Sequence, residues 1–186
     1  MEGPVLTTER LTLRPPSLED FDAWAAFAAD EEVMRTLGGV QPRSVAWRGI
    51  AGVAGSWALQ DFGMFSVVDR ASGRWLGRVG PLWLEGWPGT EIGWGLVREA
   101  WGKGIATEAA AACMDFAVDQ LGWTDIVHCI ESDNTASQNV ARRLGSTVLR
   151  AGRLPPPNEL DLDIWGQSAD QWRENRRAVR GLTLGA

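Results

Sequence analysis

The stretch "EIGWGLVREAWGKGIATEA", residues 91–109, decides the fold because its apolar periodicity changes halfway along it. In its first part Ile92, Trp94 and Leu96 alternate with small or polar residues, which is typical of a strand. Its last part opens an alanine-rich segment whose apolar residues recur at helical spacing. The stretch therefore predicts a strand, a glycine-containing loop over residues 101–104 and a helix.

The loop has the composition of an anion-binding site. The first amides of a helix have no intrahelical partner, and the helix dipole places partial positive charge there. Small residues at Gly102, Gly104 and Ala106 would let a pyrophosphate approach those amides closely. A plain turn before a core helix is the simpler interpretation, which a lone glycine pair would favour.

Two known phosphate-binding loops fit this stretch poorly. A Walker loop requires Ser or Thr after its lysine, whereas Gly104 follows Lys103. A dinucleotide fingerprint requires a third small residue where Thr107 stands, although Glu131 would supply the acidic residue at the end of the next strand. Dinucleotide-binding folds also usually begin with this unit, and here about ninety residues precede it.

The rest of the chain predicts strands and helices on both sides of this unit. We expect strands over residues 10–15, 64–69, 74–85, 90–97, 125–132, 146–154 and 160–166, and helices over 17–30, 31–37, 43–60, 105–122, 134–144 and 168–180. The first half indicates antiparallel hairpins, and the centre a β-α-β crossover between parallel strands. No linker divides the chain, so we expect one domain over residues 1–186, of the α/β class in its α+β form.

The composition limits the classes of function. The chain has 186 residues, a formal net charge of −6 and a sequence pI of about 4.9. A nucleic-acid surface would need a clustered basic face, so none is expected. The sequence shows neither a signal peptide nor an apolar run long enough for a membrane span. Two cysteines, Cys113 and Cys129, with a single histidine, argue for reduced thiols in a cytoplasmic protein and against a structural zinc site.

The ordered motifs resemble the GNAT superfamily of acyl-CoA N-acyltransferases. "EIGWGL" and "WGKGIATEA" are followed by Asn134 and Ser137 at N-x-x-S spacing and by "RRLG" at 142–145. The resemblance runs from "TTERLTLRPPSLEDF" to "LDLDIWG" and is greatest to the branch of ribosomal-protein N-terminal acetyltransferases, the RimJ/RimL-like branch. Trp101 stands where the superfamily usually has Gln or Arg, and tryptophan is the ordinary residue there in this branch.

This resemblance implies a fold and a co-substrate. The fold would be a mixed, mostly antiparallel sheet of about six to seven strands, with a splayed parallel central pair and flanking helices. Acetyl-CoA would lie with its pyrophosphate over residues 102–107 and its pantetheine along the backbone of Leu96 and Val97. The implied binding residues are Leu96, Val97, Trp101, Gly102, Lys103, Gly104, Ile105, Ala106, Thr107, Asn134 and Ser137.

Acyl transfer from a thioester to an amine requires a neutral amine and benefits from a base, an oxyanion donor and a proton for the leaving thiolate. Glu91 is the first candidate base, and Glu131, at the end of the next strand, is the second. The chain has no tyrosine to protonate the thiolate, so Ser137 is the candidate acid. Structural roles remain open for each, and His128, between apolar residues, is expected to be a core histidine.

The sequence does not identify the amine. Candidate acceptor-site segments are the loop 38–43 and those carrying Trp47, Trp57, Trp87 and Trp165, although core packing is the plainer role for the tryptophans. The predicted activity is acetyl transfer from acetyl-CoA to a primary amine of a protein N-terminus or small molecule, by direct attack. The alternative is a catalytically idle acyl-CoA-binding regulatory module. We expect a monomer or homodimer that binds neither nucleic acid nor membrane.

Overall fold

The computed structural model describes residues 3–183. The strands are β1 (Leu6–Thr7), β2 (Leu11–Arg14), β3 (Phe65–Asp69), β4 (Trp75–Leu82), β5 (Glu91–Leu96), β6 (Asp125–Ile130), β7 (Thr147–Arg153) and β8 (Asp161–Ser168). The α-helices are α1 (Phe21–Ala28), α2 (Glu31–Met34), α3 (Arg43–Gln60), α4 (Ile105–Asp119), α5 (Thr135–Arg143) and α6 (Ala169–Thr183). Each predicted strand and helix is present, with ends shifted by a few residues.

The described strands form one eight-stranded sheet in the order β1-β2-β3-β4-β5-β6-β8-β7. Among the strands of residues 3–183, only β5 and β6 pair in parallel, and α4 connects them as the crossover. The predicted mixed, mostly antiparallel sheet with a parallel central pair is therefore confirmed. The additional strand, β1, has two residues, which is too short to give an alternating pattern in the sequence.

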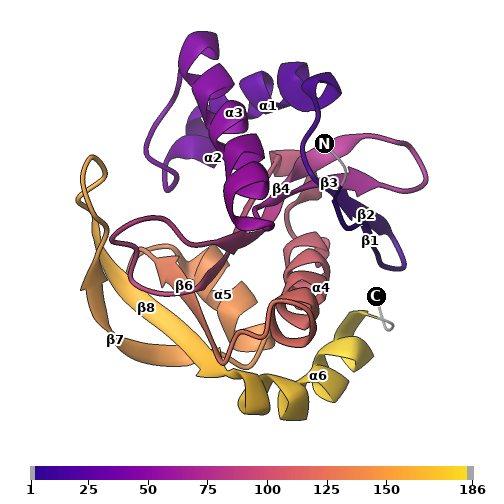
Figure 1. Ribbon diagram of the computed structural model, residues 1–186, viewed down its shortest axis with the longest axis vertical. Helices are drawn as coiled ribbons and strands as arrows, with labels where there is room; N and C mark the ends of the chain where they lie inside the picture. The colour runs from indigo at the N-terminus through magenta and orange to yellow at the C-terminus, as the bar shows by residue number, and fades with distance from the viewer. Residues whose placement is uncertain (1–2, 184–186) are drawn as a thin grey trace.

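The helices cover the sheet from two sides, as Figure 1 shows. On one side α1 and the turn after α2 lie over β5: a Cβ atom at Gly95 would be 3.0 Å from Phe27 of α1 and 3.1 Å from Leu37 of the turn. On the other side Ile92 and Leu96 pack in the main core with the buried residues of α4. This alternation was expected from the sequence of β5. It gives the strand one face toward α1 and one face toward α4, and the candidate site lies between them.

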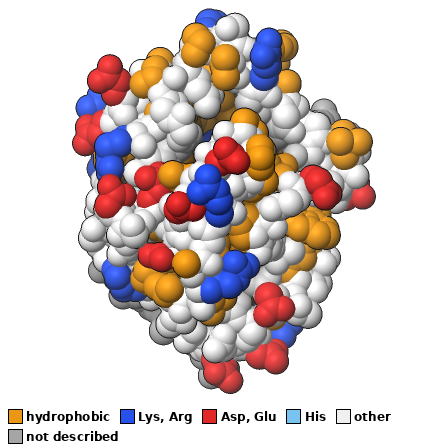
Figure 2. Space-filling view, turned by 90° about the vertical axis from the view of Figure 1, so that its left-hand side faces the viewer, with side chains coloured by type: hydrophobic (Ala, Val, Ile, Leu, Met, Phe, Trp, Pro, Cys, Tyr) orange, Lys and Arg blue, Asp and Glu red, His pale blue; other side chains and the backbone are white. Residues whose placement is uncertain are grey.

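Several tryptophans fill the core, as expected. Trp57 and Trp165 are each 5% exposed, and Trp172 is 1% exposed. The Trp57 ring meets Phe65 edge-on, with ring centroids 4.9 Å apart. No helix in the described part of the chain is long and apolar enough to cross a bilayer. On the face in Figure 2, acidic and basic side chains are interspersed rather than gathered by sign.

Candidate active site between the splayed strands

The parallel strands β5 and β6 pair at one position, Glu91 with Val127, and then diverge. In a regular parallel ladder, the next rung would join the Cys129 N–H to the Ile92 carbonyl. The Cys129 N–H instead donates to Glu91 Oε1 at 3.2 Å. The Glu91 side chain thus replaces the Ile92 carbonyl as the acceptor of the Cys129 N–H, and the two strands diverge toward their carboxyl ends.

The ring of His128 bonds the other group of this missing rung, the Ile92 carbonyl. Its Nδ1 lies 2.7 Å from the carbonyl oxygen of Ile92, and its Nε2 lies 3.1 Å from Ser146 Oγ. A carbonyl only accepts, so Nδ1 carries the proton and Nε2 accepts from the Ser146 hydroxyl. Burial lowers the pKa of His128 to about 4, so the ring is neutral near pH 7. His128 is a satisfied core histidine, as expected, and it also ends the strand pairing.

Glu91 is buried, with 6% exposure, at the point where the gap begins. Its Oε2 accepts the indole N–H of Trp87 at 2.6 Å, and its Oε1 accepts the Cys129 N–H. Burial raises the pKa of Glu91, while these two donors and the charge of Arg78 act in the opposite direction. A carboxylate with a raised pKa is a better proton acceptor than an ordinary one, which suits a general base.

Glu131 follows β6 and lies at the turn into α5, where its carbonyl accepts the Asn134 N–H at 3.0 Å. Burial, followed by the nearby charge of Asp133, raises the pKa of Glu131, and Arg35 acts against them. Both candidate carboxylates therefore sit at the parallel pair, one at the start of β5 and one beyond the end of β6. Glu91 is the more buried of the two.

Ser137 lies in the first turn of α5. Asn134 caps this helix, as expected, by accepting the Ser137 N–H on its side-chain oxygen at 3.0 Å. The hydroxyl of Ser137 accepts the indole N–H of Trp94 at 3.1 Å. A β5 side chain thus connects to the helix after β6, a contact that the sequence analysis did not anticipate.

The loop before α4 has the conformation that its glycines predict. Gly102 and Gly104 have φ values of 71° and 74°, in the left-handed region that favours glycine. Residues 101–104 are exposed, and no side chain caps the helix that starts at Ile105. The Thr107 hydroxyl, in the first turn, is buried without a hydrogen-bond partner in the described structure. Uncapped amides and an unpartnered hydroxyl at an open loop fit a pyrophosphate.

A partly buried ion pair between Arg10 and Glu108 connects this loop to the first hairpin. Arg10 Nη1 donates to the Lys103 carbonyl at 2.9 Å, and Arg10 Nε lies 2.6 Å from Glu108 Oε2. The Thr8 hydroxyl donates to the other oxygen of Glu108 at 2.5 Å. These contacts link the "TTERL" and "TEA" motifs, which are about a hundred residues apart, and they fix the position of the loop.

The backbone at the end of β5 is largely engaged within the protein. The Val97 N–H donates to the Leu76 carbonyl at 2.9 Å, and the Val97 carbonyl accepts the Ala100 N–H at 3.0 Å. Strand alternation then turns the Leu96 N–H and carbonyl toward β6. The Trp101 indole donates to that carbonyl at 2.9 Å. The Leu96 N–H also faces the gap, and no side chain of the described residues accepts its proton.

Of the tryptophans expected near the acceptor, some are buried in the core and one lies beside the candidate site. Trp57 and Trp165 are buried, while Trp47 is 48% exposed on α3. Trp87 is beside the site because it donates to Glu91. Arg78 is on the same side, with Nη1 2.8 Å from Met64 Sδ and its guanidinium 5.5 Å from the Trp24 ring. Sequence analysis missed four residues of the site, Arg10, Arg78, Trp94 and Glu108.

Neither cysteine has the properties of a nucleophile. Burial raises the pKa of Cys113, with Asp115 as the second cause. Burial also raises the pKa of Cys129, and the neighbouring Glu91 carboxylate raises it further. The thiolate is the nucleophilic form of cysteine, so both side chains are poorly suited to carry an acyl group.

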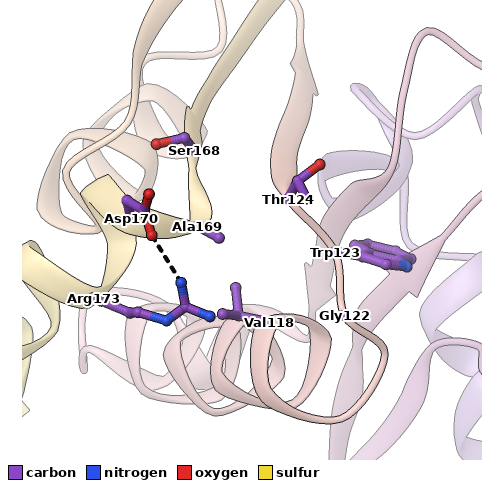
Figure 3. A pocket seen from close by; sticks show the side chains of 8 residues that line it. All are labelled: Val118, Gly122, Trp123, Thr124, Ser168, Ala169, Asp170 and Arg173. Carbon is purple, nitrogen blue, oxygen red and sulfur yellow. Dashed lines mark hydrogen bonds and ion pairs between the residues drawn. The ribbon is translucent and has the colours of Figure 1, made fainter.

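A separate pocket of about 190 Å³ lies near the other end of β6, between α4, the loop 122–124, the end of β8 and α6. Figure 3 shows the residues that line it. An ion pair between Asp170 and Arg173, at 2.8 Å, borders it. Its lining includes none of the candidate site residues.

Comparison with known proteins identifies the family. Residues 10–147 match the model of the acetyltransferase (GNAT) domain. The chain is 31% identical over 135 residues to the N-acetyltransferase p20 of Bacillus licheniformis, covering 71% of this chain and 76% of that protein. An acetyltransferase structure from Agrobacterium tumefaciens is 29% identical, with a TM-score of 0.78, covering 90% of this chain and 95% of the other.

A ribosomal L7/L12 alpha-N-protein acetyltransferase, RimL, shares the fold, with a TM-score of 0.74, 16% identity and coverage of 89% of this chain and 94% of that one. The expected superfamily and fold are therefore confirmed. This chain belongs to the GNAT acetyltransferase family and is an acyl-CoA N-acyltransferase.

Proposed function

We propose that the protein transfers an acetyl group from acetyl-CoA to a primary amine of a protein N-terminus or small molecule, by direct attack on the thioester. The observation that carries this proposal is the gap between β5 and β6, which Glu91 and His128 hold open. The RimJ/RimL-like motifs and the shared fold with RimL support a place in that branch.

Acetyl-CoA would bind through the loop and the end of β5. The amides of residues 102–107 and the Thr107 hydroxyl would receive the pyrophosphate, with the neighbouring Lys103 adding positive charge. The Leu96 N–H would donate to the pantetheine. The wider set of proposed binding residues is Leu96, Val97, Trp101, Gly102, Lys103, Gly104, Ile105, Ala106, Thr107, Asn134 and Ser137.

The reaction then needs two proton movements. Glu91 takes a proton from the amine, directly or through water, so that the nitrogen can attack the thioester carbon. The C–N bond forms, the C–S bond breaks, and Ser137 supplies a proton to the sulfur. Glu131 is the second candidate base. The raised pKa values of both cysteines favour this direct route over an acyl-cysteine intermediate.

The experiment is thiol release from acetyl-CoA with a panel of amines, followed by the mass of the products. The panel holds N-terminal peptides, free amino acids, polyamines and aminoglycosides. We expect one class to release thiol and gain one acetyl group per thiol. Acetyl-CoA binding without turnover on any amine would instead support the idle acyl-CoA-binding module. The monomer or homodimer, the single domain and the cytoplasmic location stay proposals alongside this one.

A further inference from the structure

Trp94 connects the two diverging strands through Ser137. It extends from β5, and its indole N–H donates to the Ser137 hydroxyl at 3.1 Å, in the helix that follows β6. We propose that Trp94 is a positioning residue that turns the Ser137 hydroxyl proton toward the leaving sulfur. This inference rests on the proposed function and deepens it.

The donor and acceptor properties of the Trp94 indole and the Ser137 hydroxyl determine which way the hydroxyl proton points. An indole N–H only donates, whereas a serine hydroxyl has one proton and two lone pairs. Trp94 therefore occupies a lone pair of Ser137 and leaves its proton unused. In the described structure that hydroxyl makes no second hydrogen bond. Serine in a helix commonly donates its proton back to a carbonyl of the preceding turn, and Ser137 makes no such bond.

The position of the indole is fixed by packing on β6, α5 and β8. The Trp94 ring packs against His128, with ring centroids 4.9 Å apart and an interplanar angle of 50°. It also packs on a small cluster of Ile130, Ala141 and Trp165. His128 is itself held by two hydrogen bonds. The Ser137 hydroxyl is thus oriented by a rigid group on the other side of the strand gap.

The proton balance of the step is simple. When the tetrahedral intermediate collapses, the C–S bond breaks and its electron pair stays on sulfur. The sulfur takes the proton of Ser137, and the serine oxygen recovers a proton from solvent. The amine proton leaves through the base. Trp94 touches none of the reacting atoms and acts through Ser137 alone.

The chain offers a matched control for removing the indole N–H. Trp94→Phe deletes the donor and keeps an aromatic ring. Trp75→Phe deletes another indole N–H that donates to a serine hydroxyl, that of Ser66, at 3.0 Å. We expect Trp94→Phe to lower kcat about tenfold, the factor that matches one oriented hydrogen bond, with the Kd for acetyl-CoA unchanged. Trp75→Phe is expected to leave kcat within about twofold of wild type.

A double-mutant cycle separates orientation from stability. In a Ser137→Ala background, Trp94→Phe should cause no further loss of kcat, because its target is already gone. Additive losses, or equal losses in the two Trp→Phe variants, would overturn the role of Trp94.

The same cycle is run on hydrolysis of acetyl-CoA without an amine, in which water takes the acetyl group as acetate and the leaving sulfur still needs a proton. If amines are not acetylated but the rate of this hydrolysis still falls in Trp94→Phe, the acceptor proposal fails and the role of Trp94 stands. If the wild type releases no thiol under either condition, both proposals are wrong.

Discussion

Glu91 accepts the backbone N–H of Cys129 at 3.2 Å, so the candidate base also replaces a rung of the sheet. The bond orients one carboxylate oxygen, and the Trp87 indole, at 2.6 Å, orients the other. The geometry of the base and the opening of the gap thus depend on one side chain. A change at this position should alter both proton transfer and strand pairing, unless the new side chain keeps an oxygen for the Cys129 N–H.

Glu91→Gln is predicted to lower kcat/KM by about a hundredfold or more, the usual contribution of a general base. Glutamine keeps an oxygen for the Cys129 N–H but cannot take a proton. Since burial raises the pKa of Glu91, wild-type activity should fall as the pH drops through that raised value. The variant should lose this acidic limb in a pH–rate profile. Glu131→Gln is the matched comparison, and a larger loss there would move the role to Glu131.

Arg78→Met is predicted to shift the acidic limb to higher pH. The Arg78 charge favours the ionised form of Glu91 and so lowers its pKa, and removing the charge lets that pKa rise. The measurement is kcat/KM against pH. Arg48→Met, at an exposed arginine of α3, is the control and should leave the limb in place. A shift of the limb to lower pH in Arg78→Met would contradict the assignment of that limb to Glu91.

His128 predicts a pH dependence of stability. Its pKa falls from 6.5 to about 4 on folding, so the unfolded chain binds the extra proton between these values. The stability from His128 is complete above about pH 6.5 and is lost as the pH falls toward 4, by roughly 3 kcal/mol in total. Urea unfolding at pH 7.5 and at pH 5 measures the difference in the free energy of unfolding. His128→Gln should be less stable at pH 7.5 but lose less on acidification. An identical loss in wild type and variant would show that carboxylates alone cause the dependence.

Gly104→Glu is predicted to abolish acetyl-CoA binding. The substitution puts bulk and negative charge at the loop where the pyrophosphate is proposed to lie, and it also forces a side chain at a φ of 74°. Gly73→Glu controls for the strain, because Gly73 has a φ of 71° in another turn. An added Cβ would meet nothing within 4 Å at Gly73 and only Arg10 Nη2, at an ordinary 3.5 Å, at Gly104. A thermal-shift titration reads the result. Ligand at about a hundred times its Kd should stabilise wild type and Gly73→Glu by about 2.7 kcal/mol, and Gly104→Glu not at all. Equal stabilisation of all three would refute the loop assignment.

Much of the fold follows from local patterns. The alternation in β5 and the helical spacing in α4 depend on residues a few positions apart, and the sequence displays both. Asn134 was predictable as a cap for the same reason. The two-residue β1 was not, because a pattern of period two needs more residues to appear.

The site was only partly predictable because its contacts join distant segments. Motifs identify Glu91 and Ser137 as candidate catalytic residues, but they do not identify the hydrogen-bond partners of these two side chains. Trp94 looked like one of three apolar residues on a strand face, and its bond to Ser137 depends on how far β5 and β6 diverge. Arg10 and Glu108 are nearly a hundred residues apart, and only the folded hairpin brings them together. Such pairs leave no periodic signal in a single sequence.

We propose direct acetyl transfer from acetyl-CoA to an amine at the gap between β5 and β6. A single turnover with acetyl-CoA and the amine panel tests this transfer, with the masses of both the amine and the protein recorded. We expect one acetyl group on the amine for each thiol released, and none on the protein. Acetyl-CoA binding with no acetylated amine, or an acetyl group found on Cys113 or Cys129, would contradict it.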